Sequence, residues 1–208
     1  MNRVQYLRAW SEVHGFEDGA EVSGVARWYL TLNYYLVQPL LFLRLTPNAV
    51  TLMGPALATL ALIVNGELAI AILVLASLMV DGFDGAVAII KGKSSRVGAV
   101  WDGIVDRITE LLWIGALYQG GVTPGLLLLI WTLVATQEYG RAKLTHVAGN
   151  ILGVVTICER PVRGLLVAFG FLGQIFVAQS LQGISIVWLV LQMIALIQFS
   201  VMARRQLR

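Results

Sequence analysis

Four aspartates stand within apolar sequence between residues 81 and 106, and their type and spacing could do chemistry. Asp81 and Asp84 are three residues apart, and Asp102 and Asp106 are four apart. At roughly 100° per residue, each pair therefore shares one face of a helix. An ionised side chain within a membrane costs roughly a few kcal/mol or more, so such carboxylates face the protein interior and indicate a functional site. If the two helices form a hairpin, all four carboxylates converge.

Converging carboxylates repel one another unless cations neutralise them. Hard oxygen ligands of this kind select Mg²⁺, Mn²⁺ or Ca²⁺. Gly82, Gly85, Gly98 and Gly103 accompany the aspartates, and small residues let helix backbones and a ligand approach closely. Two other interpretations of the acids stay open: a buried network of hydrogen bonds, and a pathway for cations.

The pattern Asp-x2-Asp-Gly-x2-Ala-x9-Gly-x3-Asp-x3-Asp resembles the signature of the CDP-alcohol phosphotransferase family. Members of that family are integral membrane enzymes that join an alcohol to a phosphatidyl or similar group carried on CDP. The matching positions are Asp81, Asp84, Gly85, Ala88, Gly98, Asp102 and Asp106. One position departs, because the family usually carries Arg directly after the Ala and this chain has Ile89. We expect Lys91, Lys93 or Arg96 to supply the missing positive charge; the alternative is that these residues only mark the basic side of the membrane.

The resemblance implies a role for each residue of the pattern. Asp81, Asp84 and Asp102 are expected to bind metal, and Asp106 is expected to be both a ligand and the general base. The expected cofactor is Mg²⁺ or Mn²⁺, as two ions. An acceptor hydroxyl would attack the phosphorus next to the lipid while CMP leaves. The donor, CDP-diacylglycerol, is expected to contact Gly85, Ala88, Lys91, Lys93, Arg96 and Gly98.

A second basic group resembles the acceptor-phosphate region of the branch of the family that uses CDP-diacylglycerol. It consists of Arg141, Lys143, Arg160 and Arg163, with Glu159 beside them. Guanidinium groups bind phosphate through paired hydrogen bonds, so the predicted acceptor itself carries phosphate. Glycerol 3-phosphate, phosphatidylglycerol and an inositol phosphate all fit, and we favour a glycerol-based acceptor. The alternative interpretation of these residues is a set of loop charges that contact anionic lipid.

The composition excludes an ordinary soluble domain. Of the 208 residues, 58% are hydrophobic and 13% charged, and the mean hydropathy is +0.78. Soluble domains are about one quarter charged. We therefore expect an all-α integral membrane protein that contacts membrane lipids and binds no nucleic acid. Cys158 is the single cysteine, so an intrachain disulfide is excluded.

Six membrane spans must position these residues. They are predicted at residues 46–64, 68–90, 97–118, 123–143, 162–177 and 184–202. Thr46 is placed as the N-cap of the first span and Pro47 as its first helical residue. Residues 1–45 are expected to form an interfacial arm with amphipathic helical segments, and residues 46–208 the six-helix catalytic domain. A disordered tail at the start of the arm, or a full span at 27–45, is the alternative.

Basic residues gather on one side of this map. They lie in the arm, the 91–96 link, the 141–163 loop and the C-terminus, whereas the turns near 65–67, 119–123 and 178–183 contain no Lys or Arg. This asymmetry predicts a cell-membrane protein whose termini and carboxylates face the cytoplasm. The family resemblance implies the same arrangement, and a homodimer. A cation transporter is the alternative from another functional class, although no internal repeat is visible.

Overall fold

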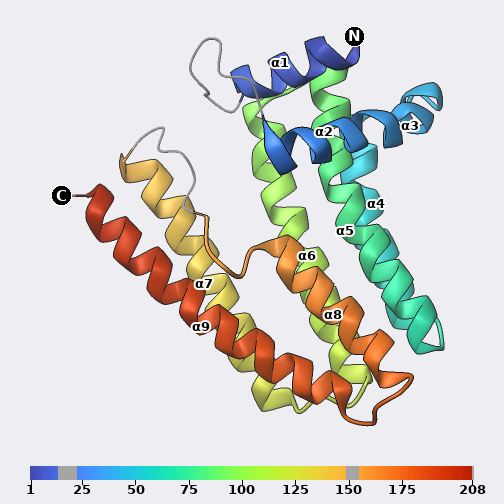
Figure 1. Cartoon of the computed structure of the whole chain (residues 1–208), viewed down its shortest axis with the longest axis vertical. Helices are drawn as coiled ribbons and strands as arrows, with labels where there is room; N and C mark the ends of the chain where they lie inside the picture. Colours follow the sequence, from blue (N-terminus) through green and yellow to red (C-terminus); the bar gives the residue numbers. More distant parts are fainter. Residues whose placement is uncertain (14–22, 149–154, 208) are drawn as a thin grey trace. The chain divides into compact units, whose positions relative to one another are not determined.

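The computed structural model describes residues 1–13, 23–148 and 155–207. Within these ranges the chain is helical and contains no strand, which confirms the predicted all-α class. The helices are α1 (Arg3–Val13), α2 (Gly24–Leu36), α3 (Gln38–Phe42), α4 (Pro47–Ile63), α5 (Glu67–Ile90), α6 (Arg96–Gln119), α7 (Pro124–Ala148), α8 (Arg160–Gln174) and α9 (Ser180–Gln206) (Figure 1). Parts of the predicted arm (14–22) and of the predicted 141–163 loop (149–154) lie outside the described residues.

The helices α4 to α9 coincide closely with the six predicted spans, but length and composition support fewer. Among the described residues, α5 and α9 are long and apolar enough to cross a membrane. A third candidate is the pair formed by Ala26–Phe42 and Pro47–Ile63, which is bent by 103°. By contrast, α8 has only 15 residues, and α6 carries several charged side chains. Six spans therefore stay a prediction.

Two compact units make up the chain, and each is built from two stretches. The first unit contains Met1–Ala56 and Ser77–Asp106, and the second contains Leu57–Ala76 and Arg107–Arg208. In the first unit α1 packs against α2, where the Tyr6 and Tyr34 rings lie 5.7 Å apart. The predicted arm thus contributes α1, α2 and α3, and its boundary with a catalytic domain at residue 46 stays a prediction.

The start of α4 follows the sequence prediction. The backbone N–H of Ala49 donates to the Thr46 hydroxyl at 3.2 Å, so Thr46 caps the helix. Pro47 is the first helical residue, where its missing N–H costs nothing. Because residues four apart lie on the same helix face, this start places Pro47 and Thr51 side by side. That face carries part of the functional site described below.

Two caps make the connection between α5 and α6 short. Gly92 has a φ of 62°, and the bonds from the N–H of Lys93 to the carbonyl of Ala88 (2.8 Å) and from Gly92 to Ile89 (3.0 Å) form a Schellman motif that ends α5. The N–H of Gly98 donates to the Ser95 hydroxyl at 3.0 Å, which caps the start of α6. The end of α5 is thereby joined to the start of α6 by a short link, as the predicted hairpin requires.

Small residues let the helices of the second unit approach closely. In that unit α9 packs against both α7 and α8 (Figure 1). A methyl group at Gly140 of α7 would lie 2.8 Å from the Phe199 ring, and one at Gly170 of α8 would lie 2.6 Å from the Ile184 side chain. Close backbone approach at small residues is typical of helix packing in membranes, where apolar burial alone does not hold helices together.

Candidate functional site

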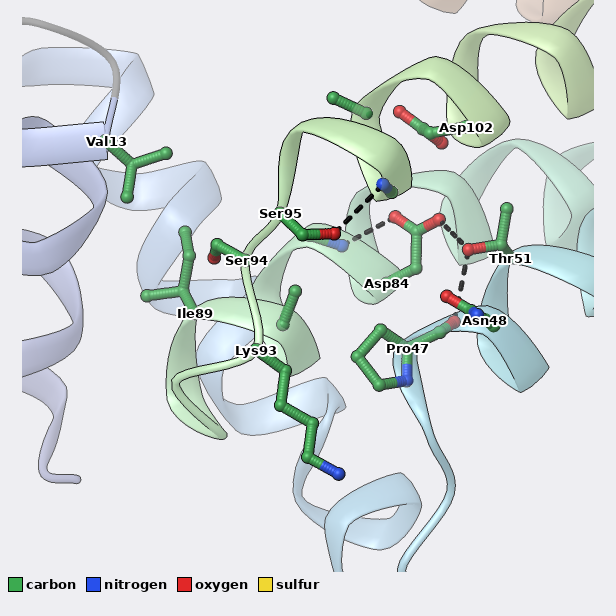
Figure 2. Close-up of a pocket in the computed structure, with 14 residues that line it drawn as sticks. Val13, Pro47, Asn48, Thr51, Asp84, Ile89, Lys93, Ser94, Ser95 and Asp102 are labelled. Carbon is green, nitrogen blue, oxygen red and sulfur yellow. Dashed lines mark hydrogen bonds between the residues drawn. The ribbon is translucent and has the colours of Figure 1, made fainter.

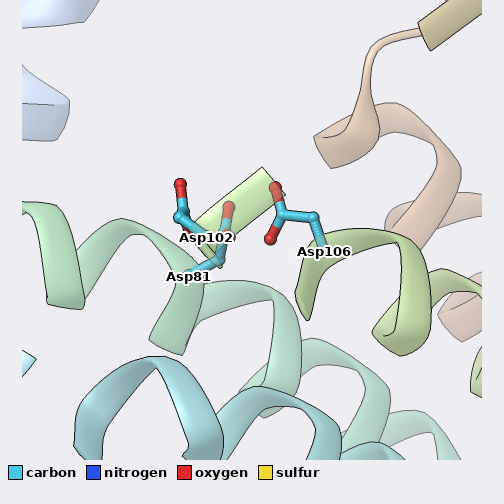
Figure 3. Close-up of side chains that lie close together, drawn as sticks. All are labelled: Asp81, Asp102 and Asp106. Atoms are coloured by element: carbon cyan, nitrogen blue, oxygen red, sulfur yellow. The ribbon is translucent and has the colours of Figure 1, made fainter. Parts of the chain in front are cut away.

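Three of the four aspartates converge in the first unit. Asp81 of α5 and Asp102 and Asp106 of α6 each offer a carboxylate oxygen, and these oxygens all lie within 4.8 Å of one another (Figure 3). Two unit charges at 4.8 Å repel by about 3 kcal/mol at an effective dielectric constant of about 20. Hard carboxylate oxygens at this spacing fit a divalent cation that offsets the repulsion. We call Asp81, Asp102 and Asp106 the carboxylate cluster.

The fourth aspartate, Asp84, is not among the three whose oxygens all lie within 4.8 Å of one another, but it interacts with Asp102 and is also held by other groups. The Thr51 hydroxyl donates to its Oδ2 at 2.6 Å, and the backbone N–H of Gly85 donates to its Oδ1 at 2.6 Å (Figure 2). Asp84 is only 6% exposed. The same hydroxyl also lies 3.1 Å from the carbonyl oxygen of Pro47. A hydroxyl has one proton and can donate one hydrogen bond. When Asp84 is ionised, the Thr51 hydroxyl donates to Asp84 and not to Pro47, and it thereby fixes the orientation of the carboxylate.

Replacement of Thr51 tests this orienting role. If Asp84 serves as a ligand as the sequence predicts, Thr51→Val should weaken Mn²⁺ binding by about 10- to 100-fold, which is the usual effect of losing a residue that orients a ligand. Thr51→Ser keeps the hydroxyl and should bind almost as the wild type does. Isothermal titration calorimetry of the detergent-solubilised protein measures the affinity. Thr59→Val is the matched control, because Thr59 is exposed on the same helix. Equal affinity in Thr51→Val and Thr59→Val contradicts the role.

A pocket of about 230 Å³ opens beside Asp84 (Figure 2). It is lined by four of the six residues predicted to bind the donor: Gly85, Ala88, Lys93 and Gly98. Residues that the sequence did not predict as donor contacts also line it: Pro47, Asn48 and Thr51 from α4, Ser94 and Ser95 from the α5–α6 link, and the two aspartates Asp84 and Asp102. The lining therefore combines one cation and two carboxylates with hydroxyl and amide groups, which suits a polar ligand.

The other two predicted donor contacts are placed elsewhere. The Lys91 ammonium donates to the carbonyl oxygen of Leu45 at 2.6 Å, and Arg96 is exposed at the start of α6. Neither lines the pocket. Ile89, which stands where the resembling family carries Arg, is buried and does line it. Lys93 is therefore the basic residue that contributes to this pocket.

A second group of charges joins three helices of the second unit. The Arg163 side chain is 0% exposed, and it donates from Nη1 to Glu110 at 3.0 Å, from Nη2 to Glu138 at 2.8 Å and from Nε to the carbonyl oxygen of Cys158 at 2.9 Å. Arg107 lies 2.6 Å from Glu110 on α6. Each of the three guanidinium nitrogens of Arg163 is thus committed within the chain. Arg163 fastens α8 to α6 and α7.

Arg141 extends this group toward the segment before α8. It donates through both terminal nitrogens to the two oxygens of Glu159, and it lies 3.8 Å from Glu138. Burial by itself raises the pKa of the Glu159 carboxyl, but hydrogen bonds from Arg141 and Thr156 outweigh it and lower that pKa below its ordinary value. Glu159 therefore stays ionised and pairs with Arg141.

The remaining residues predicted to bind the acceptor are placed differently. Lys143 is exposed, with its ammonium 5.5 Å from the centre of the Tyr139 ring. Arg160 is 8% exposed, and its guanidinium lies 5.6 Å from the centre of the Trp113 ring. Among the residues predicted to bind the acceptor, Arg141 and Arg163 share Glu138 as a partner. The sequence did not identify Glu138 or Arg107 as members of this group.

Comparison with known proteins adds an independent observation. A family model for CDP-alcohol phosphatidyltransferases matches residues 44–204. An archaetidylinositol phosphate synthase of Aeropyrum pernix is 35% identical over 100 residues, which cover 47% of this chain and 52% of that protein. A phosphatidylinositol phosphate synthase of Mycobacterium marinum is 34% identical over 147 residues, which cover 65% of this chain and 62% of that protein. The matched stretches thus span between half and two thirds of these relatives.

A solved structure shows the same fold. The phosphatidylinositol phosphate synthase of Mycobacterium tuberculosis, determined with CDP-DAG bound, superimposes with a TM-score of 0.69 at 23% sequence identity. The likeness covers 83% of this chain and 93% of that one. A second structure of the same enzyme, in complex with manganese and citrate, gives the same TM-score and covers 82% of this chain.

Proposed function

Because the chain belongs to the CDP-alcohol phosphatidyltransferase family, we propose that it transfers a phosphatidyl group from CDP-diacylglycerol to a hydroxyl of an inositol phosphate, with release of CMP. The sequence alone favoured a glycerol-based acceptor and kept the inositol phosphate as the alternative. The relatives reverse that order, because the archaeal and the bacterial protein are both named as synthases of inositol phosphate lipids. This shared name carries the choice of acceptor, and the carboxylate cluster supports the chemistry.

The reaction is a displacement at the phosphorus next to the lipid. The acceptor oxygen forms the new P–O bond, the P–O bond to CMP breaks, and Asp106 accepts the hydroxyl proton as general base. Asp81, Asp84, Asp102 and Asp106 would hold Mg²⁺ or Mn²⁺, as two ions. When bound, these ions neutralise the pyrophosphate and the charge on the departing phosphate. The close approach of three carboxylates supports this assignment, since hard oxygen ligands prefer such cations.

The nucleotide of the donor is proposed to occupy the pocket beside Asp84. Asn48 and the serines at 94 and 95 offer hydrogen bonds to its polar groups. Lys93 is proposed to supply the charge that the family's Arg provides at the position of Ile89. The Lys93 ammonium lies on a flexible side chain, so it can adjust its position to contact a phosphate. It cannot form the paired hydrogen bonds of a guanidinium.

The phosphate of the acceptor is proposed to bind the basic residues of the second unit that keep some accessibility. The Arg141 side chain is 21% exposed and Lys143 is exposed, whereas Arg160 is only 8% exposed and stays a candidate from the sequence motif alone. Arg163 was expected in the same role, but its buried pairing with Glu110 and Glu138 favours a different one. We propose that Arg163 holds these carboxylates and α8 in place and thereby supports the acceptor region.

The protein is further proposed to work as a homodimer in the cell membrane, with its active site facing the cytoplasm. The absence of Lys and Arg from the turns near 65–67, 119–123 and 178–183 supports this orientation through the positive-inside rule. A reporter fused at either terminus tests it, because both termini should lie on the cytoplasmic side.

Release of CMP tests the reaction. Purified protein in detergent with CDP-diacylglycerol, an inositol phosphate and Mn²⁺ should release CMP, and omission of the acceptor or addition of excess chelator should stop the release. A cation transporter that used the same carboxylates would release none. CMP release that persists at full rate in chelator contradicts the proposed metal dependence.

A further inference from the structure

A second pocket, of about 240 Å³, opens between the N-terminal arm and the aspartates in the first unit. Tyr6 and Trp10 of α1 and Tyr29 and Asn33 of α2 form the arm side of its lining, and Asp81 lies on the opposite side. We call it the arm pocket, and we call the pocket beside Asp84, proposed above to hold the nucleotide, the nucleotide pocket. The two pockets share Asp84, Gly85, Ile89 and Asp102. A single ligand bound at the shared residues can therefore extend into both.

Gly82 brings two polar groups of the arm against the helix that carries the aspartates. A methyl group at Gly82 would lie 2.5 Å from the Tyr29 hydroxyl oxygen and 3.1 Å from the Asn33 side-chain nitrogen. Gly82 stands between Asp81 and Asp84, so the hydroxyl and the amide lie at the same turn of α5 as those carboxylates. Asn33 is only 4% exposed, which restricts its amide to few orientations. The arm pocket thus presents two neutral hydrogen-bond donors, the buried Asn33 amide and the hydroxyl of Tyr29, which is 46% exposed.

The chemistry of this lining differs from that of the nucleotide pocket. The nucleotide pocket includes Lys93, whereas among the residues that the structure describes no Lys or Arg lines the arm pocket. Each pocket is smaller than the roughly 300–1,000 Å³ that encloses a whole drug-sized ligand, so each suits one part of the donor. An acceptor that carries phosphate would need a cation here. A neutral fragment with hydrogen-bond acceptors and apolar edges matches the tyrosines, the tryptophan and the amide.

The lipid donor has such a fragment. Its diphosphate must lie at the aspartates. The nucleoside is attached to one end of the diphosphate, and the glycerol is attached to the other end. Resting on the proposed function, we propose that the arm pocket holds the glycerol backbone of the donor, and that Tyr29 and Asn33 donate hydrogen bonds to its ester carbonyl oxygens. An ether-linked glycerol has no carbonyl to accept these bonds. The arm therefore makes the enzyme selective for ester-linked over ether-linked donors.

The selectivity is measurable with two donors that differ only in the linkage. Initial rates with CDP-diacylglycerol and with its CDP-dialkylglycerol analogue, at fixed Mn²⁺ and acceptor, give the ratio of the two kcat/KM values. The wild type should favour the ester by roughly 5- to 150-fold, because two neutral hydrogen bonds contribute about 0.5–1.5 kcal/mol each. Tyr29→Phe and Asn33→Leu should each lower the ester rate and reduce this ratio, while turnover of the ether donor is retained.

Tyr35→Phe is the matched control, since Tyr35 is exposed on the same helix and does not line the pocket. Turnover of the ether donor shows that each variant is folded and that its metal site is intact. An unchanged ester-to-ether ratio in both variants overturns the inference while the proposed function stands. A rise in the KM of the acceptor, with the ratio unchanged, assigns the pocket to the acceptor and also overturns it. If the wild type makes no lipid product from either donor, the proposed function itself fails.

Discussion

Asp81→Asn and Asp102→Asn variants are expected to lose about a hundredfold or more of their transferase activity, because removing even a residue that only supports a metal ligand costs about 10- to 100-fold. Each substitution replaces an anionic oxygen ligand by a neutral amide, which is a poorer ligand for a hard cation. Both residues belong to the carboxylate cluster, where three oxygens lie within 4.8 Å. The loss should appear as weaker Mn²⁺ binding in calorimetry and as lower kcat at saturating donor.

Glu67→Gln is the control for this experiment. Glu67 is an exposed acid in the first turn of α5, the helix that also carries Asp81, so the same change from acid to amide is made outside the site. Its Mn²⁺ affinity and activity should match those of the wild type. Wild-type Mn²⁺ affinity in both aspartate variants contradicts the assignment of the cluster as a metal site.

Arg163→Met is expected to destabilise the protein by about 3–5 kcal/mol, since removing one partner leaves a buried charge uncompensated. The Glu110 side chain is 1% exposed, and Arg163 donates to it at 3.0 Å. Arg163→Lys should also be destabilised, because one ammonium cannot reproduce the planar guanidinium that reaches both Glu110 and Glu138. Thermal unfolding in detergent measures the change as a lower Tm.

Two further variants separate a structural role of Arg163 from acceptor binding. Arg204→Met removes an exposed arginine from α9 and should leave Tm unchanged. The double variant Arg163→Met, Glu110→Leu removes both charges and should recover much of the lost stability. If Arg163→Met instead keeps the wild-type Tm and raises only the acceptor KM, Arg163 binds the acceptor as the sequence first suggested.

The convergence of three aspartates could be predicted because it depends on local geometry. Helical periodicity places Asp102 and Asp106 on one face, and a hairpin brings Asp81 to them. The caps that make the hairpin short also have sequence signals. Gly92 is a typical residue for the end of a helix and Ser95 for the start of one, so both could have been recognised.

Contacts between distant segments could not be predicted in the same way. Thr51 and Asp84 are 33 positions apart, and their hydrogen bond depends on how α4 packs against α5. Arg163 and Glu110 are 53 positions apart, and a motif of basic residues does not show whether an arginine faces a ligand or a buried carboxylate. The arm pocket likewise depends on where α1 and α2 pack.

The acceptor could not be chosen from the sequence because the three candidates share the group that basic residues recognise. Glycerol 3-phosphate, phosphatidylglycerol and an inositol phosphate all carry a phosphate, the group that Arg141 and Lys143 are proposed to bind. They differ in the rest of the molecule, which a motif of basic residues does not identify. The relatives favoured the inositol phosphate through their named products. The acceptor therefore needs a direct chemical test.

Competition between acceptors in one reaction tests the central claim most directly. Purified protein receives CDP-diacylglycerol, Mn²⁺ and equal concentrations of an inositol phosphate, glycerol 3-phosphate and phosphatidylglycerol, and the lipid products are identified by mass. We expect phosphatidylinositol phosphate to be the dominant product and to be lost in the Asp102→Asn variant. Dominant formation of phosphatidylglycerol phosphate or cardiolipin contradicts the proposed acceptor.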